Sequence, residues 1–107
     1  MREADLQRTV IDMAQTFGWR VAHFRPARTE QGWRTPVAAD GAGFPDLVLV
    51  RERVLFVELK SERGRTTPEQ SGWLSDLQSA GAFAQVWRPS DLDAIERLLR
   101  GRSADAA

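Results

Sequence analysis

Two short apolar runs, separated by three residues, constrain the fold of this chain more than any other feature. The first run is Asp46–Val50, the second is Val54–Lys60, and Arg51-Glu52-Arg53 lies between them. Nearly continuous apolar runs of this length are typical of strands that are covered on both faces. The sequence therefore predicts a buried hairpin at the centre of the molecule.

The segments around this hairpin predict helices and two further strands. Gly18 is a typical helix end, and Thr67 with Gln70 makes a capping box at a helix start. In chain order we expect a helix over Arg2–Phe17, a strand over Trp19–Phe24, the two central strands, a helix from Pro68 to about Ala80, a strand over Phe83–Trp87 and a helix from the N-cap Ser90 to about Arg100. This order, αβββαβα, predicts an α/β fold with a small mixed sheet flanked by helices.

One domain accounts for nearly the whole length. The chain of 107 residues is long enough for one small core over residues 1–100, and residues 101–107 are expected to form a disordered tail. The polar segment Arg25–Gly43, with two prolines and three glycines, is expected to be a long mobile loop. It carries Arg25, Arg28 and Arg34, which either contact nucleic-acid phosphates or form a solvated surface.

Composition excludes several classes of function. The chain has no cysteine and one histidine, which excludes disulfides, thiolate metal sites and metal motifs with two histidines. Fifteen basic residues balance fifteen acidic ones, which argues against a strongly basic nucleic-acid binder. No apolar run approaches the ~18 residues of a membrane helix, and the charged N-terminal segment is unlike a signal peptide. We therefore expect a cytoplasmic protein whose chemistry uses oxygen ligands.

The turn between the central strands decides whether two carboxylates meet. With a three-residue turn, Val50 pairs with Val54 and Asp46 falls opposite Glu58. With a two-residue turn, Asp46 falls opposite Leu59, and the two carboxylates point to different faces of the sheet. The sequence permits the first register without requiring it.

If the carboxylates meet, they need a partner. Opposed carboxylates on buried strands repel one another and are costly to desolvate. Lys60 shares the face of Glu58, because side chains alternate along a strand. A hard cation such as Mg²⁺ would relieve the repulsion, using both carboxylates as ligands. The pattern therefore indicates a metal site at the end of the hairpin.

Three further residues have two interpretations each. Lys60 is the only lysine among fifteen basic residues, so either coding bias left it by chance or the position requires a compact ammonium. The amide of Gln70 either reaches the carboxylate pair or serves only the capping box. Glu3 either faces the same site from the first helix or simply stabilises that helix's N-terminus.

These residues resemble the PD-(D/E)XK nuclease superfamily, read here as Pro45-Asp46 and Glu58-Leu59-Lys60. The context is similar to its VRR-NUC branch. That branch has Gly-x-Pro-Asp, here beginning at Gly43, and a Thr/Ser-x-x-Gln helix start, here Thr67-Pro68-Glu69-Gln70. It also has a glutamate on an early helix, which Glu3 would match.

The resemblance implies a restriction-endonuclease-like αβββαβ core and cleavage of DNA that depends on Mg²⁺, with Mn²⁺ as a substitute. Small members of this branch from bacteria and phages resemble branched-DNA nucleases that act on Holliday junctions as homodimers. Lys60 would position the attacking water or stabilise charge on the phosphoryl oxygens, and Gln70 would orient a ligand or the scissile phosphate. The metal ligands that the resemblance implies are Asp46, Glu58, the carbonyl of Leu59, and Glu3 directly or through water.

Two other functions compete with catalysis on DNA. A non-catalytic DNA-binding or assembly module with the same fold would have no need of a buried acidic pair. An RNA-processing enzyme on this scaffold would use histidine or tyrosine for acid–base chemistry, and the chain has one histidine and no tyrosine. Both alternatives are less consistent with Asp46, Glu58 and Lys60 than a DNA nuclease is.

Overall fold

The computed structural model describes residues 1–24, 27–29, 32–34 and 37–101. No helix among these described residues has the length and apolar character that crossing a membrane requires. The tail expected at 101–107 lies outside the described residues from 102 onwards. In chain order the elements are α1 (Glu3–Thr16), β1 (Arg20–His23), β2 (Ala27–Thr29), β3 (Gly32–Arg34), β4 (Leu47–Val50), β5 (Val54–Leu59), α2 (Pro68–Ser79), β6 (Phe83–Trp87), the 3₁₀ turn η1 (Pro89–Asp91) and α3 (Leu92–Arg100).

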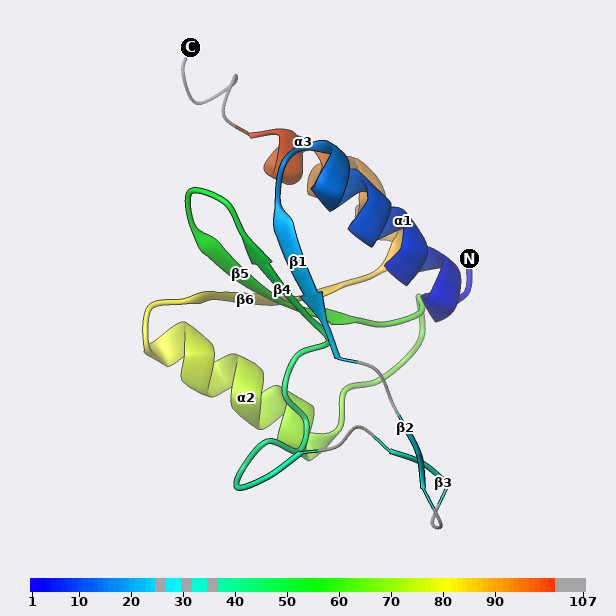
Figure 1. The fold of residues 1–107 in the computed structure, drawn as a ribbon, viewed down its shortest axis with the longest axis vertical. Coiled ribbons are helices and arrows are strands. Elements are labelled where there is room, and N and C mark those ends of the chain that lie inside the picture. Colours follow the sequence, from blue (N-terminus) through cyan, green and yellow to red (C-terminus); the bar gives the residue numbers. More distant parts are fainter. Residues whose placement is uncertain (25–26, 30–31, 35–36, 102–107) are drawn as a thin grey trace.

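A mixed four-stranded sheet forms the centre of the molecule, with the strand order β1-β4-β5-β6 (Figure 1). The strands β1, β4 and β5 are antiparallel neighbours. β6 lies parallel to β5, because α2 carries the chain back across the sheet. This arrangement confirms the predicted α/β class and is consistent with a restriction-endonuclease-like core.

The register of the central hairpin follows the three-residue turn. Val50 pairs with Val54 and Val48 pairs with Phe56, with residues 51–53 between the strands. The ladder ends with the pair of Leu47 and Val57, and Asp46 and Glu58 are the next residue beyond this pair on each strand. The sequence left two registers open, and the structure has the one that brings the carboxylates together.

The segment 25–43 is not a plain loop, which corrects the prediction. Its described part contains β2 and β3, which form a separate antiparallel pair with Arg28 opposite Trp33 and Ala27 opposite Arg34. Figure 1 shows this hairpin projecting from the body of the molecule. Strands of three residues are too short to give an alternating apolar pattern, so sequence periodicity did not reveal them.

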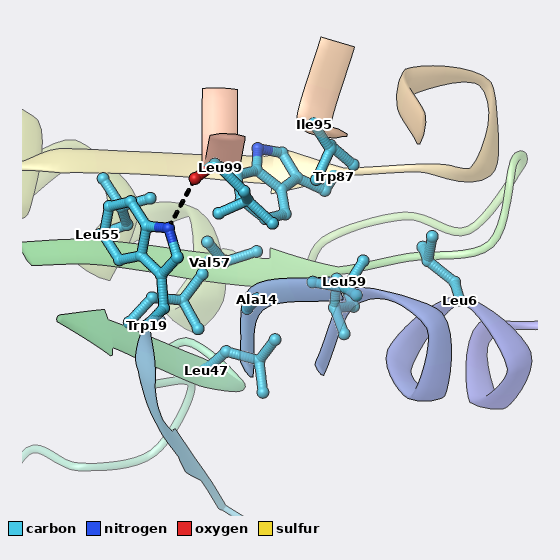
Figure 2. Packing of buried hydrophobic residues seen from close by; sticks show 12 residues of the cluster. Leu6, Ala14, Trp19, Leu47, Leu55, Val57, Leu59, Trp87, Ile95 and Leu99 are labelled. Atoms are coloured by element: carbon cyan, nitrogen blue, oxygen red, sulfur yellow. Dashed lines mark hydrogen bonds between the residues drawn. The ribbon is translucent and has the colours of Figure 1, made fainter. Parts of the chain in front are cut away.

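Helices cover both faces of the sheet (Figure 1). α1 and α3 lie together over one face, and α2 lies over the other. Figure 2 shows the buried cluster on the α1 and α3 side, where the alternate residues of β4 and β5 point inward. The fully buried leucines of this cluster are Leu6, Leu47, Leu49, Leu55, Leu59 and Leu99.

The start of α3 differs from the prediction that Ser90 is its N-cap. Ser90 lies inside the 3₁₀ turn, and its backbone N–H and hydroxyl both bond to the carboxylate of Glu62. Asp91 stands at the N-cap position of α3, where its carboxylate accepts the backbone N–H of Arg88 at 2.8 Å. Ser90 is therefore hydrogen-bonded to Glu62, a residue distant in the sequence, and does not cap α3.

One guanidinium joins the C-terminal ends of α1 and α3. Arg51 donates from Nη1 to the carbonyl oxygens of Phe17 and Leu99, each at 2.9 Å. Its guanidinium lies over the ring of Trp19, 4.5 Å from the centroid. The Trp19 Nε1–H also bonds to the Leu99 carbonyl, at 2.8 Å (Figure 2). Helix C-termini have unsatisfied carbonyls and a partial negative charge, so a cation is favourable there.

Candidate active site

The hairpin brings Asp46 and Glu58 together at the end of the β4–β5 ladder. Asp46 accepts the backbone N–H of Leu59 through Oδ2 at 2.9 Å, which ties its carboxylate to the neighbouring strand. The carbonyl of Asp46 accepts the N–H of Phe24 at 3.1 Å. The aspartate is thus fixed between the ends of β1 and β5.

Glu58 is a buried carboxylate with one oxygen paired and one not. Its side chain is only 2% exposed. Oε2 accepts a hydrogen bond from Gln70 Nε2 at 2.9 Å and lies 3.6 Å from the Lys60 ammonium. While Glu58 is ionised, Oε1 has no hydrogen-bond partner among the described residues. An orphaned buried oxygen of this kind is costly, and native proteins seldom keep one without a functional reason.

Burial and a neighbouring charge raise the pKa of Glu58 to about 8. Desolvation is the largest cause, because removal from water disfavours the charged carboxylate. The Asp46 charge raises the pKa further, and so does a hydrogen bond that a protonated Glu58 makes to Asp46. Lys60 acts in the opposite direction, and Glu3 adds a small upward effect. Without a bound cation, the site therefore holds a proton near neutral pH.

Gln70 serves the helix and the site at once. Its Oε1 accepts the backbone N–H of Thr67 at 2.9 Å, and the Thr67 hydroxyl accepts the Gln70 N–H at 3.1 Å. This capping box leaves the amide NH₂ directed at Glu58. The sequence offered capping and site contact as alternatives, and the structure combines them.

Lys60 enters the site from the end of β5. Its backbone N–H bonds to the Trp87 carbonyl at 3.1 Å, which extends the β5–β6 pairing by one residue. Its side chain is 14% exposed, so it is largely shielded from solvent. The ammonium therefore lies beside the Glu58 carboxylate in a mostly buried site.

Gly43 is a positioning residue that sequence reasoning noted only as part of a motif. It has φ +83°, and a Cβ there would lie 2.6 Å from the carbonyl carbon of Glu69. The next residue, Phe44, packs edge-to-face on Trp73 of α2 with centroids 5.0 Å apart. Only glycine allows this approach, which holds the segment leading to Asp46 against the first turn of α2.

The structure brings some predicted residues together and leaves others apart. Glu3 is exposed in the first turn of α1, near enough for its charge to affect Glu58. Within the described ranges, no three His, Cys, Asp or Glu side chains converge closely enough to hold a metal by themselves. Arg28 and Arg34 have backbone positions on β2 and β3, away from the carboxylates, and Arg25 lies outside the described residues.

The donor set fits a hard divalent cation. Two carboxylates lie close together, and one of them, Glu58, has an unpaired buried oxygen. Its pKa is raised first by burial and then by the charge of Asp46. Oxygen ligands of this type suit Mg²⁺ or Mn²⁺, which complete their coordination with water and substrate oxygens. Asp46 and Glu58 are the residues that would hold the ion.

Comparison with known protein families matches residues 33–91 to the VRR-NUC domain. The match covers more than half of the chain and includes Asp46, Glu58, Lys60 and Gln70. No curated protein and no solved structure gave a significant match. PD-(D/E)XK nucleases generally use divalent metals, in agreement with the donor set. The chain belongs to the VRR-NUC domain family, a nuclease domain family of the PD-(D/E)XK-like superfamily.

Proposed function

We propose that the chain is an endonuclease that hydrolyses phosphodiester bonds in DNA and depends on Mg²⁺, with Mn²⁺ as a substitute. The observation that carries this proposal is the buried Glu58 carboxylate, which has an orphaned oxygen and lies beside Asp46. A structural role does not account for two adjacent carboxylates in a small core, because the pair destabilises the protein that contains it.

The chain's own residues have distinct roles in this function. Asp46 and Glu58 bind the cation, with the Leu59 carbonyl as a further ligand and Glu3 contributing directly or through water. When bound, the cation neutralises the carboxylates and polarises the phosphoryl group. Leu59 N–H and Gln70 Nε2 hold one oxygen of each carboxylate, so the other oxygens stay available for the cation.

Lys60 supplies the positive charge that faces the substrate. Its ammonium either positions the attacking water or stabilises the negative charge that develops on the phosphoryl oxygens. The 3.6 Å contact with Glu58 Oε2 keeps this ammonium at the site before substrate arrives. Such preorganised charge is effective because nothing has to move when the reaction begins.

We further propose that the substrate is branched DNA, such as a Holliday junction, and that the active form is a homodimer. A two-fold dimer has one active site per protomer and matches a junction that has two equivalent strands to cut. The β2–β3 hairpin supports an extended contact with DNA, because it projects from the body and carries Arg28 and Arg34 (Figure 1).

A cleavage assay tests the function directly. Labelled four-way junction, flap, duplex and single-stranded DNA are each incubated with the protein in Mg²⁺, Mn²⁺ or EDTA. We expect cleavage in both metals, none in EDTA, and a preference for the junction. Asp46→Asn and Glu58→Gln should each abolish cleavage and weaken Mg²⁺ binding in a calorimetric titration. DNA binding without cleavage in either metal would instead support a non-catalytic module.

A further inference from the structure

The loop Ser61–Thr66 carries two exposed arginines between the two sides of the site. It connects Lys60, at the end of β5, to Thr67, the N-cap of α2. Arg63 and Arg65 are both exposed in it, and neither makes a hydrogen bond or ion pair with any part of the chain that the structure describes. The loop therefore presents two free positive charges on the segment between Lys60 and the N-cap of α2.

This loop is held in place from the β6–α3 junction. Arg88 Nη1 donates to the carbonyl oxygens of Ser61 and Gly64, both at 2.7 Å, and more weakly to that of Glu62 at 3.3 Å. The Glu62 carboxylate accepts the N–H of Ser90 at 2.9 Å and its hydroxyl at 2.8 Å. These bonds lower the pKa of Glu62. The one acid of the loop is thus engaged with Ser90, while its arginines are left unpaired.

A rigid loop with unpaired cations is suited to binding an anion, since little conformational entropy remains to be lost on binding. Arg63 is three residues from Lys60, so their Cα atoms are at most about 11 Å apart. A backbone phosphate close to the scissile one is within reach of an extended arginine side chain from that distance. Arginine is also the side chain best matched to phosphate, because its planar fork can make two parallel hydrogen bonds.

We propose that Arg63 and Arg65 bind DNA backbone phosphates beside the scissile phosphate, and that Arg88 and Glu62 fix the loop for this purpose. The inference rests on the proposed function and adds a phosphate-binding loop to it. These contacts hold the strand that is cut, and they carry no base specificity because every nucleotide has the same phosphate.

Salt-dependent binding tests the loop. Affinity for a fluorescein-labelled four-way junction is measured by anisotropy in EDTA at several NaCl concentrations. Arg63→Ala/Arg65→Ala should lower the slope of log K against log salt by up to about 1.8 and weaken binding about 10-fold or more at moderate salt. Arg63→Lys/Arg65→Lys should restore most of the slope, because the slope counts neutralised phosphates. Arg97→Ala, an exposed arginine of α3 with no ion pair in the described structure, is the matched control for the single variants Arg63→Ala and Arg65→Ala, because each removes one charge.

The possible outcomes distinguish failure of the loop proposal from failure of the proposed function. If the double alanine variant keeps the wild-type slope and affinity while the wild-type protein cleaves DNA, the loop proposal is wrong and the proposed function stands. An equal loss in Arg97→Ala would also overturn the proposal, because general charge would explain the result. A wild-type protein that neither binds nor cleaves any DNA would overturn both.

Discussion

Glu58 makes the stability of the metal-free protein depend on pH. Its pKa is about 8 in the folded state, against 4.5 for an ordinary glutamate. Between these values the folded state keeps a proton that the unfolded state releases. Folding stability therefore falls as pH rises from about 4.5 to about 8, and the loss is complete above that range. This one carboxyl group therefore makes the metal-free protein less stable at alkaline pH than at acidic pH.

We predict that Glu58→Gln removes this dependence. In EDTA, the melting temperature of the variant should exceed that of the wild type at pH 9 and approach it at pH 5. The pH-dependent loss of unfolding free energy in the wild type is at most about 5 kcal/mol, because each pKa unit corresponds to about 1.4 kcal/mol. Added Mg²⁺ should raise the melting temperature of the wild type more than that of Glu58→Gln. If the melting temperatures of the two proteins changed with pH in the same way, Glu58 would not be the group responsible for the pH dependence.

Lys60 gives a second test at the scale of one residue. As a simple counter-ion, it could be replaced by arginine with little loss, because a guanidinium also pairs with carboxylates. If Lys60 positions a reacting atom, arginine cannot replace it, because the wider guanidinium would displace that atom by about 1 Å. We predict that Lys60→Arg loses about 100-fold in single-turnover cleavage and keeps its melting temperature. A rate above a third of the wild type would mean that Lys60 is only a counter-ion.

At the scale of elements, the first turn of α2 both starts a helix and supports the site. Thr67→Ala removes the capping hydroxyl and leaves the Gln70 amide in place. Gln70→Ala removes the other half of the capping box together with the contact to Glu58. Each should lose about 1 kcal/mol of stability through the cap. We predict that single-turnover cleavage falls at least 10-fold further in Gln70→Ala than in Thr67→Ala. Equal cleavage rates in the two variants would mean that Gln70 acts only as a helix cap.

Two glycines provide a matched pair for the contact between α2 and the Asp46 segment. A Cβ at Gly43 would overlap the backbone of Glu69, but a Cβ at Gly72, within α2, meets nothing within 4 Å. We predict that Gly43→Ala destabilises the protein by about 1–3 kcal/mol, measured by urea unfolding, and impairs cleavage. Gly72→Ala should instead stabilise it by about 0.4–1 kcal/mol. A stable, active Gly43→Ala would show that the close approach is not required.

The elements also show what the sequence could and could not predict. The β4–β5 hairpin was predictable because its apolar runs are long enough to mark both strands. The helix start at Thr67 was predictable because a capping box is a local pattern. The pairing of Glu62 with Ser90 was not, because it joins residues 28 positions apart with no periodic signal. The register could be offered only as one of two alternatives, because a two-residue and a three-residue turn both fit the same apolar runs.

At the scale of the whole molecule, several apolar side chains remain outside the core. Val50 and Val54, at the tip of the hairpin, are 39% and 43% exposed, and Phe24 and Val37 are also exposed. We predict that the protein is a homodimer in solution, so that light scattering gives about twice the chain mass of 12.0 kDa. A particle of the chain mass at micromolar concentration that still cleaves junctions would contradict this.

The contact of Arg51 and Trp19 with Leu99 has a consequence for protein synthesis. Trp19 and Leu99 are 80 positions apart, so the hydrogen bond between them cannot form until residue 99 has left the ribosome. The nascent chain therefore carries a complete Asp46–Lys60 segment long before its core can close. Such long-range closure is slow and exposes apolar strands meanwhile. The packing of α3 against the sheet is therefore the step that completes the core and covers these strands.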